Sequence, residues 1–224
     1  VCVPSRCSFF TGLYPHVHGH RTMSYLLRPG EKNLFSQLKS AGYSVWMNDR
    51  NDLCAAQYPG WVESQADVIF SGTGPAAPGP VDQQQRGAPG GKYYYSHFEG
   101  ELQVDTDGRN YSRDDEAVDA AIARIRQWKP GDAPLCLFLG LLFPHPPYEV
   151  EEPWFSSIDR SKLTPRIRWE NCRGKSRMME LIHHYQNLQD LTEREWDELR
   201  AVYLGMCAKV DAQFGRLCDA LRQA

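Results

Sequence analysis

The sequence predicts an α/β fold in which a mostly parallel β-sheet is flanked by helices. Segments 43–47 (YSVWM) and 135–143 (LCLFLGLLF) are strand candidates, and helical periodicity precedes and follows each of them. The run 135–143 is almost continuously apolar, which is typical of a strand buried on both faces of a parallel sheet. Helices that alternate with such strands favour a sheet covered by helices.

The N-terminal region predicts two short helices separated by a loop. Pro4 suits the first turn of a helix, where its missing N–H has no intrahelical partner, and a helix over 4–11 would end at Gly12. Residues 12–22 (GLYPHVHGHRT) are expected to be a loop. A second helix is predicted over 31–41. Its expected core face is Leu34, Phe35 and Leu38, and its stop is Gly42.

The middle of the chain predicts an irregular segment and a longer helix. Residues 71–91 are rich in proline and glycine and are expected to form a loop, and 92–102 (KYYYSHFEGEL) to form an edge strand or hairpin. A helix is predicted from Ser112, with Asp115 three residues on as in a capping box. Its expected core face is Val118, Ala121, Ile122, Ile125 and Trp128.

The last predicted helix starts at Thr192, with Glu195 completing a capping box. Its expected apolar stripe is Trp196, Leu199, Tyr203, Met206, Val210, Leu217 and Leu221. We expect segment 135–143 to be the central strand, flanked by helices near 112–128 and 192–222.

Two polar segments follow the predicted strands. Segment 48–52 (NDRND) comes after 43–47, and segment 144–148 (PHPPY) comes after 135–143. In open α/β sheets, ligands bind at the carboxyl ends of the strands. Both segments are therefore expected on the rim where this fold favours chemistry.

Composition excludes several classes of function. The formal net charge of −3, with both signs interspersed, offers no basic face for a nucleic acid. No run approaches the roughly 18 apolar residues of a membrane span. The seven cysteines are scattered, which argues against a disulfide framework and favours reduced thiols and a cytoplasmic location.

The opening segment VCVPSRCSFFTG indicates a reactive cysteine. Cys2 precedes the predicted start of a helix, where free N–H groups favour negative charge. Arg6 adds a cation one turn away, with a fork that suits a tetrahedral oxyanion. The alternative is that Pro4 and Ser5 begin the helix and Cys2 simply packs.

The histidine-rich run HVHGH (16–20) could suggest a metal site on one face of a strand. Pro15 and Gly19 break strand geometry, however, and no acidic residue lies beside the histidines in the sequence. We therefore do not expect a metal site at this run.

The opening segment resembles the C-x-P-S-R…T-G signature of the type I sulfatases, which belong to the alkaline phosphatase superfamily. The matching residues are Cys2, Pro4, Ser5, Arg6, Thr11 and Gly12. Four further stretches resemble the same family: LYPHVHGHRT, AGYSVWMNDRNDL, FPHPPYEVEEPW and YLGMCAKVDAQFGRLCDAL. The resemblance thus extends over nearly the whole chain and implies the fold of that superfamily.

The resemblance implies a mechanism and a set of site residues. Cys2 would be oxidised to formylglycine by the formylglycine-generating enzyme, and its hydrate would attack the sulfur of a small-molecule sulfate ester. The same residue would contact a divalent cation, most often Ca²⁺, with Mg²⁺ as the alternative. Arg6 would hold the formylglycine, and His145 would contact the sulfate and protonate the leaving oxygen.

The chain departs from the family pattern after its first strand. Asp49-Arg50 replaces the usual Gly-Lys, and Asp52 stands where many members have histidine. Arg50 keeps the positive charge but has a different shape. Arg50, Asp52 and His145 are thus the expected substrate-binding residues.

The family's other metal ligands, an acidic pair before the cysteine motif and an Asp with Asn or His after the last helix, are not found in residues 1–224. We therefore interpret the chain as the central part of a single catalytic domain, without its N-terminal strand and C-terminal portion, and expect it to be inactive alone. Two alternatives remain: a phosphonate or phosphate ester hydrolase of the same superfamily, and a non-catalytic sulfatase-like domain.

Overall fold

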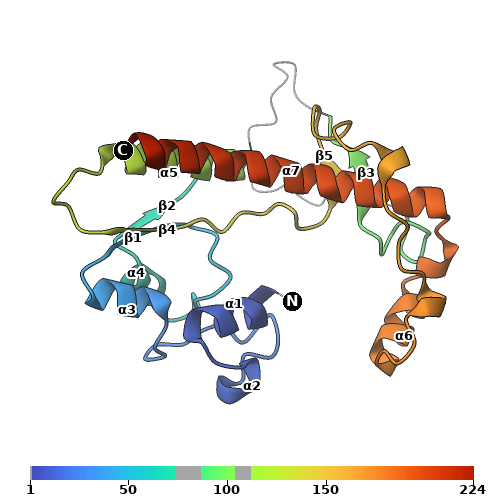
Figure 1. Cartoon of the computed structure of the whole chain (residues 1–224). Coiled ribbons are helices and arrows are strands. Elements are labelled where there is room, and N and C mark those ends of the chain that lie inside the picture. The colour runs from blue at the N-terminus through green and yellow to red at the C-terminus, as the bar shows by residue number, and fades with distance from the viewer. Residues whose placement is uncertain (1, 74–86, 104–111) are drawn as a thin grey trace. The chain divides into compact units, whose positions relative to one another are not determined.

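The computed structural model describes residues 2–73, 87–103 and 112–224, which divide into two compact units. The first unit comprises residues 1–74, 113–141 and 216–224, and the second comprises 75–112 and 142–215. Each unit has its own β-sheet and hydrophobic core. The prediction of an α/β fold with parallel strands flanked by helices is confirmed (Figure 1).

The first unit is built on a parallel sheet with the strand order β2-β1-β4. β1 (Ser44–Asn48) pairs with β2 (Val68–Phe70) on one side and with β4 (Leu135–Phe138) on the other. The expectation that 135–143 is the central strand is wrong, because β1 takes that place in the described part of the chain and β4 lies at the edge. β4 is also short, since the backbone leaves the sheet after Phe138.

Alternate residues of β4 contact two different cores, so both faces of the strand are covered as expected, but all four residues are only partly buried. Cys136 and Phe138 pack in a cluster with residues of α1 (Cys2–Thr11) and α3 (Leu34–Ser40). Leu135 and Leu137 pack with α5 (Arg113–Gln127). In Figure 1, α3 and α4 (Trp61–Gln65) lie on one side of this sheet and α5 lies on the other.

The helices before β1 follow the prediction with three differences, one of which is that α3 starts at Leu34, three residues later than expected. α1 starts at Cys2, two residues earlier than expected, and ends before Gly12, whose φ of +70° suits a residue without a side chain. Within the predicted loop, Pro15–His18 forms a helical turn, α2. α3 begins after Asn33, which makes a capping box with Ser36.

The first position of α3 also corrects one predicted core residue. Phe35 is buried as expected, but Leu34, the first residue of α3, is exposed and does not belong to the core cluster of α1 and β1. In α5 the expected core face is confirmed for Val118, Ala121, Ile122 and Ile125. Trp128 lies beyond the end of α5 and donates from Nε1 to Ala133 O at 3.0 Å.

The second unit has a small parallel sheet, in which β3 (Phe98–Glu101) pairs with β5 (Tyr148–Val150). The predicted strand within 92–102 is therefore found, but it pairs in this separate sheet. Most of the predicted loop 71–91 lies outside the described residues. The remaining helices of the unit are η1 (Arg160–Lys162), η2 (Trp169–Asn171), α6 (Arg177–Tyr185) and η3 (Leu188–Asp190).

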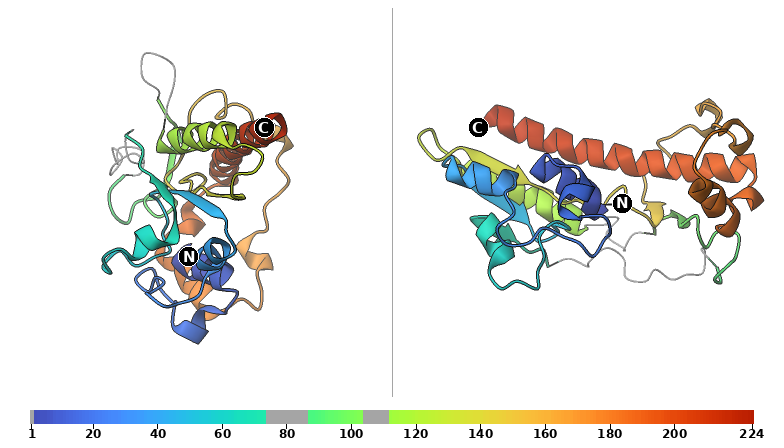
Figure 2. Two further views of the ribbon diagram at one scale, coloured as in Figure 1. Left: turned by 90° about the vertical axis from the view of Figure 1, so that its left-hand side faces the viewer. Right: turned by 90° about the horizontal axis from the view of Figure 1, so that it is seen from below.

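α7 (Glu193–Gln223) is a single helix of 31 residues. Its predicted capping box is confirmed, because Thr192 N donates to Glu195 Oε2 at 2.8 Å and Glu195 N donates to Thr192 Oγ1 at 3.3 Å. The predicted stripe is confirmed in part. Tyr203 and Leu221 are exposed, and the polar Lys209 and Gln213 are buried. The other members of the stripe are buried or partly buried: Trp196, Leu199, Met206, Val210 and Leu217. Figure 2 shows the C-terminal end of α7 beside α5, where Ala220 joins the α5 core.

No helix in the described part of the chain combines the length and apolar character that a membrane crossing needs.

Candidate active site

The N-terminal turn of α1 places Cys2 at a helix start. Val3, Cys7 and Phe10 are the buried face of this helix and anchor it in the first core. Cys2 is half-exposed, and its Sγ lies 3.4 Å from Sδ of Met23. The free N–H groups of the first turn of this ten-residue helix favour negative charge at that position.

Burial separates Cys2 from the neighbouring core thiols. Burial raises the pKa of Cys7 to about 11, with Glu31 adding to the effect, and raises the pKa of Cys54 to about 12. Neutral thiols of this kind are inert fillers of a core. Cys2 is therefore the accessible thiol of the pair in α1, as its position in the motif suggested.

Arg6 lies one turn after Cys2 and is held by the segment that follows β1. Its Nη1 donates to Asn51 O at 3.0 Å, and its Nη2 lies 3.7 Å from Asp52 Oδ2. Nε of Arg50 approaches the same Asp52 oxygen at 3.4 Å. The structure thus brings three predicted site residues, Arg6, Arg50 and Asp52, to one place, with the carboxylate between two guanidinium groups.

The backbone of residues 48–54 is fixed by two asparagine side chains. Asn48 donates from Nδ2 to Gly140 O at 3.2 Å, and its Oδ1 accepts from Gly140 N at 2.6 Å. Oδ1 of Asn51 accepts from the backbone N–H groups of Leu53 and Cys54 at 2.9 and 2.7 Å. These bonds join the carboxyl ends of β1 and β4 and turn the carbonyl of Asn51 toward Arg6.

Gly140 and Asn48 help to shape the candidate site, and the sequence alone did not single them out. A Cβ at position 140 would overlap the backbone oxygen of Arg50 and would lie 3.4 Å from Nη1 of Arg6. A glycine inside an apolar strand pattern often marks such a close backbone approach. The glycine in LCLFLGLLF was therefore the available signal.

The two remaining rim residues are found in different surroundings. Asp49 is exposed, and its backbone N–H donates to Phe70 O at 2.8 Å. His145 belongs to the second unit, is exposed, and has Nδ1 2.6 Å from Pro146 O. The role of His145 as an acid stays a prediction.

The histidine run has the acidic partner that the sequence reading did not find. Glu31 lies beside both His18 and His20, although it is 13 residues from His18 in the chain. In the described residues, these three side chains are the one group of three or more histidine, cysteine or acidic residues arranged to share a metal ion.

A calcium or magnesium ion at Cys2 would need several oxygen ligands. The described residues near Cys2 do not form such a set, because the one group that could hold a metal does not include Cys2. The described residues near the cysteine thus do not fit a complete hard-cation site.

Comparisons with known proteins agree on one family. The family model Sulfatase matches residues 1–224. Arylsulfatase K of Danio rerio is 22% identical over 241 residues, which include 99% of this chain and 42% of that protein. Two solved structures cover the whole chain and half of their own: phosphonate monoester hydrolase of Silicibacter pomeroyi (TM-score 0.62, 21% identity) and that of Agrobacterium radiobacter (TM-score 0.58, 22% identity).

The fold and the rim define an α/β protein with paired arginines at the carboxyl ends of a parallel sheet, beside a helix that starts at a cysteine. This chain belongs to the sulfatase family. It spans about half the length of the relatives that it matches, 42% of the curated protein and 50% of each solved structure.

Proposed function

We propose that this chain is the part of a sulfuric ester hydrolase that carries the nucleophile and the oxyanion-binding arginines. The observation that supports this proposal most directly is the position of Cys2 in the first turn of α1, one turn from an Arg6 whose guanidinium is fixed by Asn51 and Asp52. A formylglycine made from Cys2 would supply the nucleophile for a sulfate ester, in a protein that also uses a divalent cation.

Each rim residue has a separate task in this proposal. Arg6 and Arg50 bind oxyanion oxygens, because guanidinium forks match tetrahedral oxyanions. Asp52 keeps the two cations close together until an anionic substrate arrives. His145 is the proposed proton donor to the leaving oxygen, a role that suits an imidazole near neutral pH.

A second candidate function is hydrolysis of phosphonate or phosphate esters. Both reported solved relatives are phosphonate monoester hydrolases. An arginine pair accepts sulfur and phosphorus oxyanions by the same contacts. A third possibility, a non-catalytic sulfatase-like domain, rests on the replacement of Gly-Lys by Asp49-Arg50.

The test uses the full-length protein, produced in a host that contains the formylglycine-generating enzyme. Peptide mass spectrometry should find formylglycine at position 2, and Cys2→Ala should abolish turnover of an aryl sulfate while the circular dichroism spectrum is unchanged. Rates on matched aryl sulfate and aryl phosphonate esters decide between the first two functions. An active preparation with only unmodified cysteine at position 2 would contradict the mechanism.

Arg50 gives a second test of the same proposal. Arg50→Ala should reduce kcat/KM by about 10²–10³-fold, as for loss of one preorganised donor. Arg126→Ala, at an exposed arginine in the last turn of α5, is the matched control and should leave the rate unchanged. Equal rates for the two variants would favour Arg50 as a mere surface partner of Asp52.

A further inference from the structure

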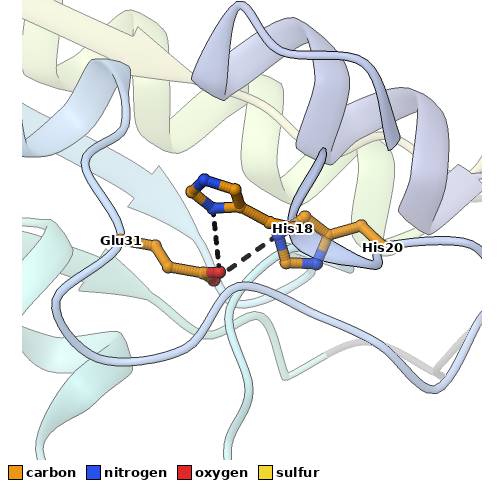
Figure 3. A group of neighbouring side chains, drawn as sticks. All are labelled: His18, His20 and Glu31. Atoms are coloured by element: carbon orange, nitrogen blue, oxygen red, sulfur yellow. Dashed lines mark hydrogen bonds and ion pairs between the residues drawn. The ribbon is translucent and has the colours of Figure 1, made fainter. Parts of the chain in front are cut away.

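The end of α2 and the loop that follows it bring two imidazoles to one carboxylate. Nδ1 of His18 lies 3.1 Å from Glu31 Oε1, and Nε2 of His20 lies 3.5 Å from Glu31 Oε2. Figure 3 shows both rings turned toward the Glu31 carboxylate. All three ligand atoms lie within 4.8 Å of one another, so a single ion could contact all of them.

His20 is buried in an orientation that suits a metal ligand. Its side chain is 4% exposed, and its Nδ1 lies 2.8 Å from Tyr25 O. Because a carbonyl only accepts, Nδ1 carries the hydrogen, and in the neutral ring the lone pair is on Nε2. Nε2 has no hydrogen-bond partner and faces the Glu31 carboxylate. A metal-bound histidine typically donates its other N–H to a carbonyl in this way.

Arg28 holds the Glu31 carboxylate in place. Its backbone N–H donates to Glu31 Oε2 at 2.7 Å, and its guanidinium donates to Oε1 at 3.0 Å. Oε2 of the carboxylate faces Nε2 of His20 at 3.5 Å, and a carboxylate oxygen and a nitrogen lone pair at this distance need a proton or a cation between them.

We propose that His18, His20 and Glu31 form a binding site for a divalent transition metal of the Zn²⁺ type. Zinc bonds of about 2.0–2.1 Å to imidazole nitrogen and carboxylate oxygen put tetrahedral ligands about 3.3 Å apart. The two observed separations between imidazole nitrogen and carboxylate oxygen, 3.1 Å for His18 and 3.5 Å for His20, lie on either side of that value. Two imidazoles and one carboxylate suit Zn²⁺ and disfavour the harder Ca²⁺ and Mg²⁺. Water would complete the coordination.

The position of this site gives the metal a structural role near Cys2. Residues 18–31 form a loop whose two ends the metal would join, and Met23 within the loop contacts Sγ of Cys2. The guanidinium of Arg28 competes with a cation for Glu31, but its side chain is 54% exposed and can turn into solvent. The Arg28 backbone N–H would still orient the carboxylate.

The test is titration of the metal-free protein with Co²⁺, followed by displacement with Zn²⁺. Seven free cysteines could also bind these metals, so the spectrum must distinguish the ligands. We expect one Co²⁺ with visible bands of nitrogen and oxygen ligation and without the ultraviolet charge-transfer band of a cobalt–thiolate bond. His18→Ala and Glu31→Gln should weaken binding at least about 100-fold, more than loss of an outer-shell partner.

His16→Ala is the matched control, because His16 is an exposed histidine of the same helical turn, stacked on Tyr14 and outside the cluster. It should bind Co²⁺ like the unmodified protein. His18 is also exposed, so His18→Ala is expected to fold, which circular dichroism checks. Three results would overturn the proposal: equal Co²⁺ affinity of the His16 and His18 variants, a cobalt–thiolate spectrum, or no Co²⁺ binding at all. In the last case the three side chains would form only an ion pair of histidine with Glu31.

Discussion

The rim of the first unit and the interior of the second unit hold their charges in opposite ways. At the rim, the side chains of Arg6, Arg50 and Asp52 are 22%, 29% and 34% exposed. The two arginines share the carboxylate of Asp52. In the second unit, Glu149, Glu151 and Lys209 are 5%, 7% and 5% exposed. Partly exposed pairs contribute little to stability and can exchange partners, whereas a buried charge depends on the partner it has. The rim is therefore suited to binding an anion, and the buried charges to fixing a structure.

The buried ion pair should give the largest single effect on stability. Lys209 Nζ lies 2.6 Å from Glu151 Oε1, and Lys209→Met would leave the Glu151 carboxylate buried without this cation. We expect a loss of about 3–5 kcal/mol in the free energy of unfolding, measured by urea denaturation. The double variant Lys209→Met/Glu151→Leu should recover most of the loss. A change below about 1 kcal/mol in the single variant would mean that the pair behaves like the exposed ones.

Glu149 should make the second unit less stable as the pH rises. Burial, with a smaller contribution from Glu99, raises the pKa of Glu149 from 4.5 to about 7. Between these two values the unfolded state releases its proton first, so stability falls with pH through this window and is constant on either side. The shift corresponds to about 3 kcal/mol at pH 8. Glu149→Gln should flatten the profile and be the more stable protein at pH 8.

The control for this prediction is Glu101→Gln, an exposed carboxylate on the same small sheet. It should leave the pH profile of urea unfolding unchanged. A profile of Glu149→Gln that still falls between pH 4.5 and 7 would assign the titration to another group, with Glu99 the first to examine.

Local signals in the sequence predicted most of the elements but not the contacts between them. The strand at 43–47, the helix ending at Gly12 and the capping box of Thr192 and Glu195 depend on neighbouring residues, and all three are confirmed. The pairing of Asn48 with Gly140 joins residues 92 positions apart. No periodicity contains that information, because it depends on which strands pair and in which register.

The burial of α7 shows a different limit of pattern reading. An apolar stripe predicts a buried face only when the core is apolar, and the face that α7 buries includes Lys209 and Gln213 together with the small Ala201. Likewise, the sequence indicated Arg6 and Arg50 as separate site residues, but it could not predict that both contact Asp52. Asp52 reaches them through a positive φ of 43°, a conformation that composition does not reveal.

At the rim, the backbone should matter more for stability than the charges. Gly140→Ala would place a methyl group against the carbonyl of Arg50, which is held by the Asn48–Gly140 bonds. We expect a loss of about 1–3 kcal/mol by overpacking and a large loss of catalytic rate in the full-length protein. Gly215→Ala, where an added Cβ meets nothing within 4 Å, is the control and should be neutral or slightly stabilising.

The smallest effect on stability should come from Asp52→Asn, although this change removes the carboxylate that two arginines share. The two ion pairs, at 3.7 and 3.4 Å and partly exposed, contribute about 0–1 kcal/mol. Asparagine also tolerates the positive φ of this position, so the backbone is not strained.

The guanidinium groups released in Asp52→Asn should bind an external oxyanion more tightly. Inorganic sulfate should therefore inhibit the variant at lower concentration, most clearly at low ionic strength. The control is Asp119→Asn, which removes an exposed partner of Arg216 away from the rim. It should be as stable as Asp52→Asn but should not bind sulfate more tightly. If both variants bound sulfate with equal affinity, the arginine pair would not be an oxyanion site. The partly exposed charges of the rim would then have no more role in binding an anion than the buried charges of the second unit.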